Sequence, residues 1–369
     1  MELEEVYLQK LHAVSFKNFA ELDLEFSPHV NCFVGPNGAG KTNVLDAIYY
    51  LSFCKSYFNA VDAQNIQHAN PFFVIQGVYQ KSDKHEEIYC GLKRGQKKQF
   101  KRNKKLYDKF ADHIGEIPLV MITPYDIDLI YEGSETRRKF MDGIISQYNK
   151  KYLEVLLQYN KILTQRNATL KTMAKSGFFD TTLLSVYNEQ LIELAPFLHQ
   201  SRVTFLNDFE LLFNQYYHLI SGEAEEVSLT HKAHLTDDNM ENCLNSVLEA
   251  DRFKQYTSKG PHKDDLVFTI GQRPLKKFGS QGQQKSFLIA LKLAQFEFIK
   301  QQTHKRPLLL LDDIFDKIDE SRAKNLMNIV GELPFGQLFI TDTHPNRVKE
   351  LFDEKNTEIK LFKVSQGVI

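Results

Sequence analysis

The sequence predicts an α/β fold in which a mostly helical segment interrupts a domain built on buried strands. Three observations predict it. The glycine-rich loop GPNGAGKT, residues 35–42, follows an apolar strand pattern and precedes a helical one. Residues 144–176 lack glycine and proline and repeat apolar side chains every three or four positions. Strand and helix patterns then return, including the run LLLLDD at 308–313.

Length and composition exclude several classes of protein. At 369 residues the chain exceeds one ordinary core, so we expect two domains or one domain with a large insertion. Cys32, Cys54, Cys90 and Cys243 form no C-x-x-C pair, which argues against a zinc site or a disulfide framework. No apolar run approaches the ~18 residues of a membrane span, and the N-terminal residues are unlike a signal peptide. We therefore expect a cytoplasmic protein without a membrane partner.

The first third of the chain alternates between strand and helix patterns. Apolar residues at 22–26 and 30–34 predict strands that end at the glycine loop. Apolar residues at helical spacing from Val44 to Leu51 predict a helix directly after the loop. Short β-rich pieces from Phe72 to about Met121 predict a meander with at least one hairpin.

The middle of the chain is predicted to be helical. Residues 144–176 favour one long amphipathic helix, and a second helical stretch, interrupted around Pro196, runs to about Ile220. Residues 221–255 show no clear period, and we expect loops with a short helix there.

Buried strands return at 308–311 and 337–340. The helical middle therefore reads as an insertion. We predict that 1–122 and 256–369 form a head and that 123–255 form a helical arm.

The glycine loop has the residue types that phosphate binding requires. It fits the pattern G-x-x-x-x-G-K-[ST]: glycines let backbone N–H groups approach phosphate oxygens, Lys41 adds a cation, and Thr42 offers a hydroxyl to magnesium. We therefore expect ATP and Mg²⁺ as cofactors. The expected nucleotide-binding residues are Gly35, Pro36, Asn37, Gly38, Ala39, Gly40, Lys41, Thr42 and Asn43.

The run LLLLDD predicts a buried strand that delivers two carboxylates to the edge of a parallel sheet where α/β folds bind ligands. We expect Asp312 to join Thr42 as a magnesium ligand. Asp313, which orients or deprotonates the attacking water, and Lys41 are the expected catalytic residues.

A second anion site is predicted at a helix start. Residues 278–286, FGSQGQQKS, precede an apolar helical pattern, and helix N-termini bind anions. The expected contacts are Ser280, Gln281, Gly282 and Gln283. A simple helix N-cap explains the same residues, and the sequence leaves both interpretations open.

Taken together, these motifs resemble the ABC-type ATPase heads of the SMC and RecF group. The stretches EGSETRRKFMD at 132–142, QRNATL at 165–170 and KGPHKDDL at 259–266, and the order of all segments, resemble the RecF family. The resemblance covers essentially the whole chain.

The resemblance implies an ABC-type P-loop ATPase head with an inserted, mostly helical arm. It implies a homodimer that forms on ATP, in which the segment at Ser280 closes on the γ-phosphate held by the other subunit. It further implies binding of double-stranded DNA or single-strand/double-strand junctions, and cooperation with RecR and RecO in RecA loading at gaps and stalled forks, within DNA replication, repair and the SOS response.

The sequence departs from the family's pattern after the second carboxylate. Asp316-Lys317-Ile318-Asp319 stands in place of Ser-Glu-Leu-Asp, and Asp313 stands where most ABC proteins have glutamate. Because the aspartate side chain is shorter, we expect slow hydrolysis.

A run of cations is the predicted DNA contact. Eight of the thirteen residues from Lys93 to Lys105 are Lys or Arg, so a hairpin there would aim cations at phosphates; a solvated loop is the alternative. The expected DNA-binding residues are Lys97, Lys98, Lys101, Arg102, Lys104, Lys105, Arg137 and Arg138. For Arg137 and Arg138 the alternative is pairing with acidic residues that brace the arm. His344 is a candidate γ-phosphate sensor or a plain loop histidine, and Gln64 and Gln67 are candidates for a lid glutamine.

Three other readings compete with an ATP-gated DNA clamp. The nucleotide-binding subunit of a membrane transporter shares the head motifs, but in such a subunit fewer residues separate the glycine loop from the segment that corresponds to SQGQQKS. A small-molecule kinase leaves SQGQQKS unexplained. The last alternative is a scaffold that binds ATP without hydrolysing it. Substitution of Asp313 distinguishes it from the clamp, because a scaffold would lose no activity.

Overall fold

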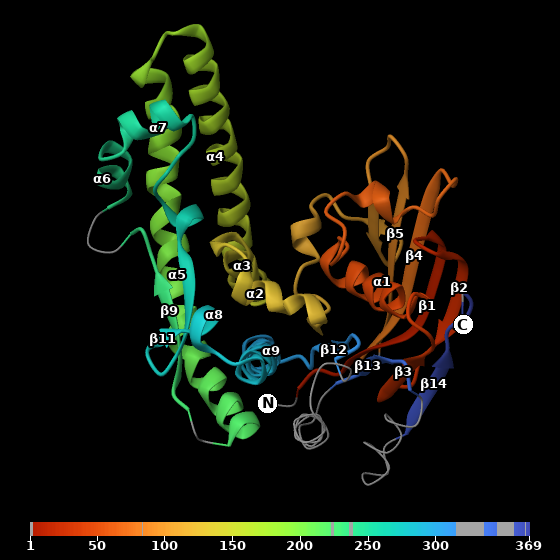
Figure 1. The fold of residues 1–369 in the computed structure, drawn as a ribbon. Helices are drawn as coiled ribbons and strands as arrows, with labels where there is room; N and C mark the ends of the chain where they lie inside the picture. Colours follow the sequence, from red (N-terminus) through yellow and green to blue (C-terminus); the bar gives the residue numbers. More distant parts are fainter. Residues whose placement is uncertain are drawn as a thin grey trace. The chain divides into compact units, whose positions relative to one another are not determined.

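The computed structural model describes residues 3–82, 84–222, 225–235, 239–314, 336–344, 358–365 and 367–369. The chain forms two compact units, each assembled from separate segments (Figure 1). The first unit comprises Met1–Asp126, Tyr216–Glu223 and Lys285–Ile369, and the second comprises Ile127–Gln215 and Ala224–Gln284.

The first unit contains an antiparallel sheet of six strands in the order β2-β1-β4-β5-β6-β7. Short connections join β4 to β5, β5 to β6 and β6 to β7 in turn, as the predicted meander requires, and β1 to β2, whereas β1 and β4 pair across a long stretch of chain. Its strands are β1 (Val6–Phe16), β2 (Phe19–Glu25), β4 (Phe72–Lys81), β5 (Lys84–Lys93), β6 (Gln99–Arg102) and β7 (Lys105–Leu106).

A second sheet of the first unit is parallel, with five strands in the order β14-β3-β13-β12-β8. Its three central strands are almost wholly apolar and buried, as is typical of parallel sheets covered on both faces. Its strands are β3 (Val30–Val34), β8 (Leu119–Ile122), β12 (Leu308–Leu311), β13 (Leu338–Asp342) and β14 (Ile359–Lys363).

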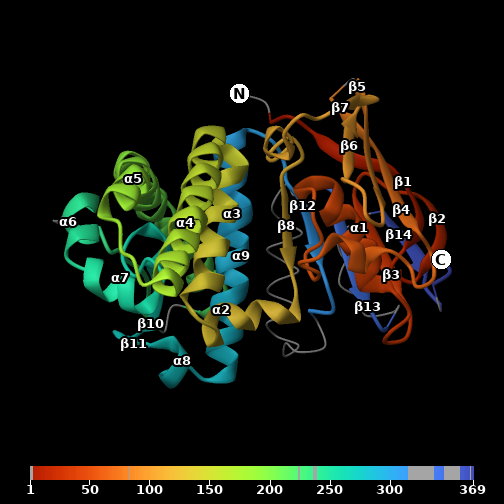
Figure 2. The same ribbon diagram turned by 90° about the horizontal axis from the view of Figure 1, so that it is seen from above.

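The helix α1 (Lys41–Phe53) packs against strands of both sheets and so forms the centre of the unit's core (Figure 2). Val44, Ile48 and Leu51 of this helix are fully buried. The helix α9 (Gln281–Thr303) begins in the second unit and continues into the first. Within the first unit its Phe287 ring meets Tyr217 edge-on, with 6.2 Å between the ring centroids.

The second unit is mostly helical and carries one small antiparallel sheet in the order β11-β10-β9. Its core includes two buried arginines, Arg166 and Arg202, each paired with a buried or partly buried carboxylate. Its elements are α2 (Asp128–Tyr131), α3 (Ser134–Tyr148), α4 (Lys150–Ser176), α5 (Thr181–Ser221), β9 (Val227–Lys232), α6 (Met240–Asn245), α7 (Leu248–Lys254), β10 (Asp265–Ile270), β11 (Arg273–Pro274) and α8 (Leu275–Phe278).

The predicted fold class is confirmed, but the helical middle differs from the expectation in two places. The predicted single helix over 144–176 is divided at Asn149, whose side chain accepts a hydrogen bond from the Tyr152 N–H and so caps α4. The predicted interruption at Pro196 does not occur: α5 continues through it. Buried neighbours such as Ala195 and Leu198 hold the helix together although proline removes one backbone donor.

The boundaries of the second unit also differ from the predicted arm, 123–255. Residues 256–284, which we expected in the head, belong to the second unit. The reason is long-range pairing, because β10 forms its ladder with β9, a strand that was expected to be loop. Among the described residues, no helix is long and apolar enough to span a membrane.

Candidate functional site: the carboxyl edge of the parallel sheet

Neighbouring parallel strands of the first unit bring the predicted site residues to one edge of the parallel sheet. The strands β3, β13 and β12 are adjacent and parallel, so their carboxyl ends meet. β3 leads into the glycine loop, β12 into Asp312 and Asp313, and β13 into Thr343 and His344. Two motifs that lie 270 positions apart in the sequence therefore form one site.

The glycine loop is held in a conformation that depends on its glycines. Gly40 has φ +114°, in the left-handed region. At Gly35 an added Cβ would lie 2.1 Å from the Val364 carbonyl oxygen, so no larger residue fits. The Lys41 ammonium is 2% exposed and donates to the Gly35 and Pro36 carbonyl oxygens, at 2.9 and 3.2 Å. Carbonyl oxygens of the loop thus hold the ammonium group of Lys41.

Thr42 and Asp312 are in direct contact. The Thr42 hydroxyl donates to Asp312 Oδ1 at 2.9 Å, and the Thr341 hydroxyl donates to the same oxygen at 2.8 Å. Burial, and after it the neighbouring Asp313 carboxylate, raise the pKa of Asp312 against these two hydrogen bonds, to about 6. A buried carboxylate with a raised pKa is one that a cation would stabilise.

Asp313 lies beside the loop cation. Its φ of 44° is left-handed, and its N–H donates to the Thr341 hydroxyl at 2.9 Å. Its Oδ1 lies 4.0 Å from Lys41 Nζ and makes no hydrogen bond within the described part of the chain. The two expected catalytic residues are therefore together, with one carboxylate oxygen uncommitted.

The remaining nucleotide candidates are placed differently. His344 is exposed after β13, and its N–H donates to Asp342 Oδ1. Gln67 donates to the Asn18 carbonyl oxygen, whereas Gln64 is exposed on a short turn. Residues 316–319, where the sequence departs from the family's pattern, lie outside the described residues.

The predicted second anion site is a helix N-terminus with a reciprocal cap. The Ser280 N–H donates to Gln283 Oε1 at 2.6 Å, and the Gln283 N–H donates to the Ser280 hydroxyl at 3.2 Å. Such a capping box satisfies two backbone donors at the start of α9. Ser280 and Gln283 therefore cap α9, and their predicted role in anion binding stays a prediction. Gln281 and Gly282, which stand inside the box, form the first turn of α9.

Most of the basic run lies in and around β6 and β7 at the edge of the antiparallel sheet. Because successive side chains of a strand point to opposite faces, the cations of the run fall into an inward and an outward group. Phe100 is buried, so the even-numbered neighbours also point inward. The Lys98 ammonium pairs with Asp62 at 2.7 Å, and Arg102 pairs with Glu116 at 3.1 Å and with Glu86. These two cations are committed to structural pairs.

Four of the other six cations of the run were predicted to contact DNA, and they lack such partners in the described part of the chain. No carboxylate in the described part of the chain pairs with the ammonium groups of Lys97, Lys101, Lys104 or Lys105. The ammonium of Lys101 lies over the Tyr89 ring, 5.1 Å from its centroid. The Lys97, Lys104 and Lys105 side chains are exposed.

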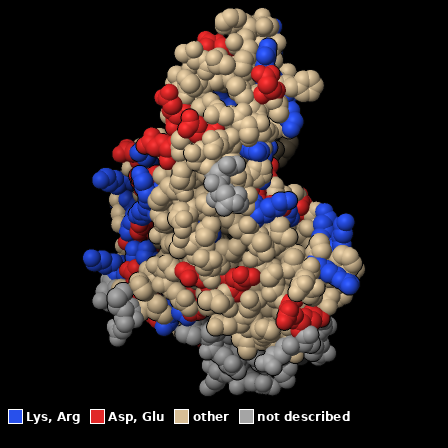
Figure 3. Space-filling view, turned by 90° about the vertical axis from the view of Figure 1, so that its left-hand side faces the viewer, with Lys and Arg blue, Asp and Glu red and all other residues tan. Residues whose placement is uncertain are grey.

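Arg137 and Arg138 brace the second unit. The Arg137 guanidinium forms two hydrogen bonds to the Asp265 carboxylate, at 2.7 and 3.0 Å. Arg138 donates to the Asp264 carbonyl oxygen and to the Ser134 hydroxyl. Figure 3 shows Lys and Arg interspersed with Asp and Glu on the face that it draws, so charge alone does not mark a DNA surface there.

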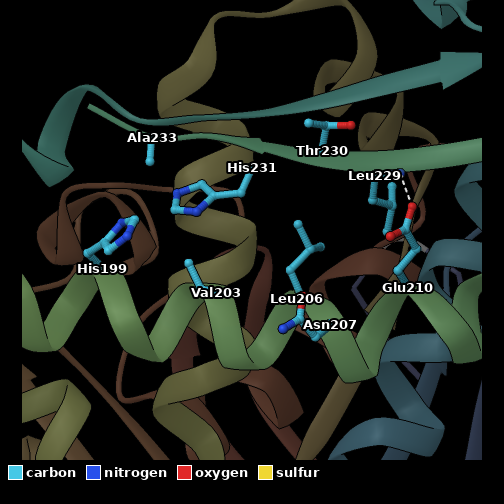
Figure 4. A pocket seen from close by; sticks show the side chains of 9 residues that line it. All are labelled: His199, Val203, Leu206, Asn207, Glu210, Leu229, Thr230, His231 and Ala233. Carbon is cyan, nitrogen blue, oxygen red and sulfur yellow. Dashed lines mark hydrogen bonds between the residues drawn. The ribbon is translucent and has the colours of Figure 1, made fainter. Parts of the chain in front are cut away.

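A groove of about 570 Å³ lies within the second unit between α5 and β9 (Figure 4). His199 and His231 face each other at one end, with 5.8 Å between ring centroids, and Glu210 lies toward the other end. Glu210 accepts a hydrogen bond from the Leu229 N–H, and His231 pairs with Asp264. The groove shares no residue with the predicted motifs.

The sequence analysis did not single out two residues beside the glycine loop. Asn18, in the turn between β1 and β2, donates to the Ala39 carbonyl oxygen, and so does the Gly367 N–H. Asn18 stands in a polar turn, Lys17-Asn18, between two strand patterns, which is the only signal that the sequence offered. Contacts over such long sequence separations leave no local pattern.

Comparisons with known proteins find relatives that match nearly the whole chain. The family model described as "RecF/RecN/SMC N terminal domain" matches residues 7–369. The chain is 52% identical to a DNA replication and repair protein RecF of Flavobacterium johnsoniae, covering 97% of this chain and 100% of that protein. It is 48% identical to the protein of that name from Phocaeicola vulgatus, covering 98% and 97%.

Solved structures give the same result. A structure described as the recombination mediator protein RecF-ATPrS in the RecFOR pathway matches with a TM-score of 0.88 and 27% identity, covering 100% of this chain and 98% of that one. An Smc head domain from Pyrococcus furiosus matches with a TM-score of 0.57 and 13% identity, which is a likeness of fold.

Proposed function

The chain belongs to the RecF family of DNA replication and repair proteins, and on this basis we propose that it is a cytoplasmic, ATP-gated DNA clamp with slow ATP hydrolysis. The observation that carries the proposal is the meeting of the glycine loop with Asp312 and Asp313 at one sheet edge. A related chain that is 28% identical is described as RecF-ATP, and we assign ATP to this loop.

The loop residues 35–43 would hold the nucleotide phosphates through backbone N–H groups, with the Lys41 ammonium beside the terminal phosphates. Among the described residues, that ammonium donates to the carbonyl oxygens of Gly35 and Pro36 and lies near Asp313. An incoming phosphate offers it a stronger, charged acceptor. Lys41 is thus positioned to exchange neutral partners for an anion.

The residues at this edge fit a magnesium ion. Thr42 and Asp312 present hard oxygen donors 2.9 Å apart, and burial raises the pKa of Asp312, a carboxylate that a cation would stabilise. Thr42 and Asp312 would hold the ion, which when bound neutralises phosphate charge. Thr341 orients Asp312 through its hydroxyl.

Asp313 is the group that we assign to the attacking water. Its Oδ1 makes no hydrogen bond in the described part of the chain, and its backbone is fixed by Thr341. An uncommitted carboxylate oxygen can accept a water proton. The aspartate is one methylene shorter than glutamate, and the slow hydrolysis that we propose follows from the looser hold on water.

The DNA contact that we propose is the outward row of the basic edge: Lys97, Lys101, Lys104 and Lys105. Contacts of ammonium groups with phosphates give affinity without sequence preference. The partners that family membership suggests are a second copy of the chain, whose Ser280 segment would meet the nucleotide, and RecR, with RecO and RecA downstream at gaps and stalled forks.

The test is DNA binding by fluorescence anisotropy, with and without ATP and magnesium, on duplex and junction DNA. We expect ATP to tighten binding by roughly fivefold to 100-fold, the usual range of coupling between two sites. Lys41→Ala should abolish this gain. Asp313→Asn should keep the gain while lowering hydrolysis by about 100-fold or more, because a general base is lost.

An unchanged DNA affinity on addition of ATP, in a wild type that binds ATP, would contradict the clamp. Unchanged hydrolysis in Asp313→Asn would remove the role given to that carboxylate.

A further inference from the structure

The glycine loop is bound from outside by two segments that are distant in sequence. The Asn18 side-chain amide, in the β1–β2 turn, donates to the Ala39 carbonyl oxygen at 3.1 Å. The Gly367 N–H donates to the same oxygen, also at 3.1 Å. Two donors from opposite ends of the chain therefore converge on one loop carbonyl.

The Ala39 carbonyl controls the direction of a phosphate-binding donor. In a planar trans peptide the C=O and the following N–H point in opposite directions. With the Ala39 oxygen held outward by two hydrogen bonds, the Gly40 N–H is directed to the opposite side of the loop. Backbone N–H groups of such loops are what bind phosphate oxygens.

Asn18 also fixes the loop sterically and at its far end. Its Oδ1 accepts a hydrogen bond from Asn43 Nδ2 at 2.6 Å, which ties it to the first turn of α1. Its amide nitrogen fills the space beside Gly40, where an added Cβ would lie 2.4 Å away. One side chain thus contacts Ala39, Gly40 and Asn43.

The Asn18 turn is itself fixed. The Lys17 N–H donates to the Asn65 carbonyl oxygen at 2.8 Å, and the Lys17 ammonium pairs with the fully buried Asp46 of α1 at 2.5 Å. Gly367 packs closely on the same turn, since an added Cβ there would lie 2.7 Å from the Asn18 carbonyl oxygen.

We propose that Asn18 and Gly367 form a clamp that positions the phosphate loop, with Asn18 as a positioning residue for nucleotide binding. Neither residue belongs to the loop motif. The clamp acts on the orientation of the Ala39–Gly40 peptide and leaves the reacting groups, Lys41 and Asp313, untouched. This inference rests on the proposed ATP site.

The test compares Asn18→Ala and Gly367→Ala with the wild type in the full-length protein. We expect the ATP dissociation constant, measured by calorimetry with magnesium, to rise about fivefold to tenfold in each, the value of one lost hydrogen bond. Asn18→Ala removes the side-chain donor. Gly367→Ala keeps its N–H, but the added Cβ would lie 2.7 Å from the Asn18 carbonyl oxygen at a φ of +80°, so the segment must shift away from the Ala39 oxygen. The KM for ATP should rise equally while kcat at saturating ATP stays unchanged, because no reacting group is altered.

A third variant, Asn18→Asp, sharpens the test. It keeps the size of the side chain and the acceptor for Asn43, but it removes the donor and places a carboxylate against the Ala39 oxygen. We expect weaker ATP binding than in Asn18→Ala, with the difference shrinking at high salt because the added charge is screened.

The matched control is Asn239→Ala. Asn239 caps α6 in the second unit through one hydrogen bond from the Asn242 N–H at 2.8 Å. Its replacement costs a similar amount of stability and should leave the ATP affinity unchanged.

The outcomes separate the clamp from the proposed function. Equal ATP affinity in the wild type, Asn18→Ala and Gly367→Ala would overturn the clamp and leave the proposed function standing. A kcat that falls while KM stays constant, or an equal loss of affinity in Asn239→Ala, would also overturn it. A wild type that binds no ATP would overturn both.

Discussion

A buried ion pair lies where the chain leaves the first unit and enters it again. Lys292 Nζ of α9 lies 2.6 Å from Asp126 Oδ1, and the two side chains are 5% and 4% exposed. Lys292 also donates to the Met121 carbonyl oxygen, and Asp126 accepts from the Tyr57 hydroxyl at 3.0 Å. These partners lie within the first unit, so the pair joins α9 to the segment that follows β8.

Removal of one partner leaves the other charge buried and unpaired. We therefore expect Lys292→Met to lower the free energy of unfolding by about 3–5 kcal/mol. Addition of Asp126→Asn to this variant should restore part of the loss, because the uncompensated carboxylate is then gone. Urea unfolding of the wild type, both single variants and the double variant measures the coupling.

The control for this cycle is an exposed pair. Lys139 and Glu135, at 2.7 Å and 75% and 72% exposed, lie at helical i,i+4 spacing. Lys139→Met should cost less than about 1 kcal/mol, since exposed pairs contribute little. A coupling between Lys292 and Asp126 no larger than that of the exposed pair would refute the argument.

At the scale of elements, the edge of the antiparallel sheet separates structural from exposed cations. The inward positions carry Lys98 and Arg102, both in ion pairs, and the outward positions carry Lys97 and Lys101. A short hairpin beyond them presents Lys104 and Lys105 to solvent. The proposed DNA contact is thus half of the basic run.

Removal of the two charges of this hairpin should lower the salt dependence of DNA binding. Each lost phosphate contact lowers the slope of log affinity against log salt by about 0.9 on duplex DNA. Lys104→Ala with Lys105→Ala should therefore reduce the slope by about 2 and weaken binding alike on all sequences. Anisotropy titrations at several salt concentrations measure it.

A matched pair of cations provides the control. Lys171 and Lys175 are exposed on α4 in the second unit, so Lys171→Ala with Lys175→Ala removes the same charge elsewhere. An equal fall in slope for both double variants would mean that the edge is not a specific DNA surface.

The sequence predicted those elements whose signals are local. The strand, glycine loop and helix from Val30 to Phe53 follow from spacing alone, and LLLLDD predicted β12 at the residues that the structure gives it. The breaks at Asn149 and Pro196 were misjudged because a cap and the burial of neighbours decided them. Neither is visible in a hydrophobic period.

Long-range contacts explain the rest. The alternation around Phe100, which divides the cations, was readable from the sequence once that aromatic residue is taken as buried. The contacts of Asn18 and Gly367 with Ala39 were not, because they join segments that only the folded sheet order brings together. The residues of the glycine loop and the two carboxylates could thus be predicted from the sequence, whereas the contacts that Asn18 and Gly367 make with the loop could not.

At the scale of the whole molecule, each unit holds a histidine in the same arrangement, fully buried at His113 and partly buried at His262. In the first unit His113 Nε2 lies 2.7 Å from the Leu51 carbonyl oxygen and Nδ1 lies 3.1 Å from the Tyr107 hydroxyl. In the second unit His262 Nε2 lies 2.9 Å from the Thr257 carbonyl oxygen and Nδ1 lies 2.8 Å from the Tyr159 hydroxyl. A neutral imidazole satisfies both contacts by donating from Nε2 and accepting at Nδ1.

Protonation of either ring would disturb this arrangement, and burial lowers the pKa of both histidines from 6.5 to about 4. Between these values the unfolded chain binds a proton that the folded protein does not, so stability falls as the pH is lowered from about 6.5 toward 4. We expect each histidine to contribute a loss of about 2 kcal/mol at pH 5. Urea unfolding at pH 7.5 and pH 5 tests this, with His113→Asn as the comparison. The variant should lose less stability than the wild type over the same pH interval, because one of the two titrations is absent; an identical pH dependence would contradict the assignment of that loss to His113.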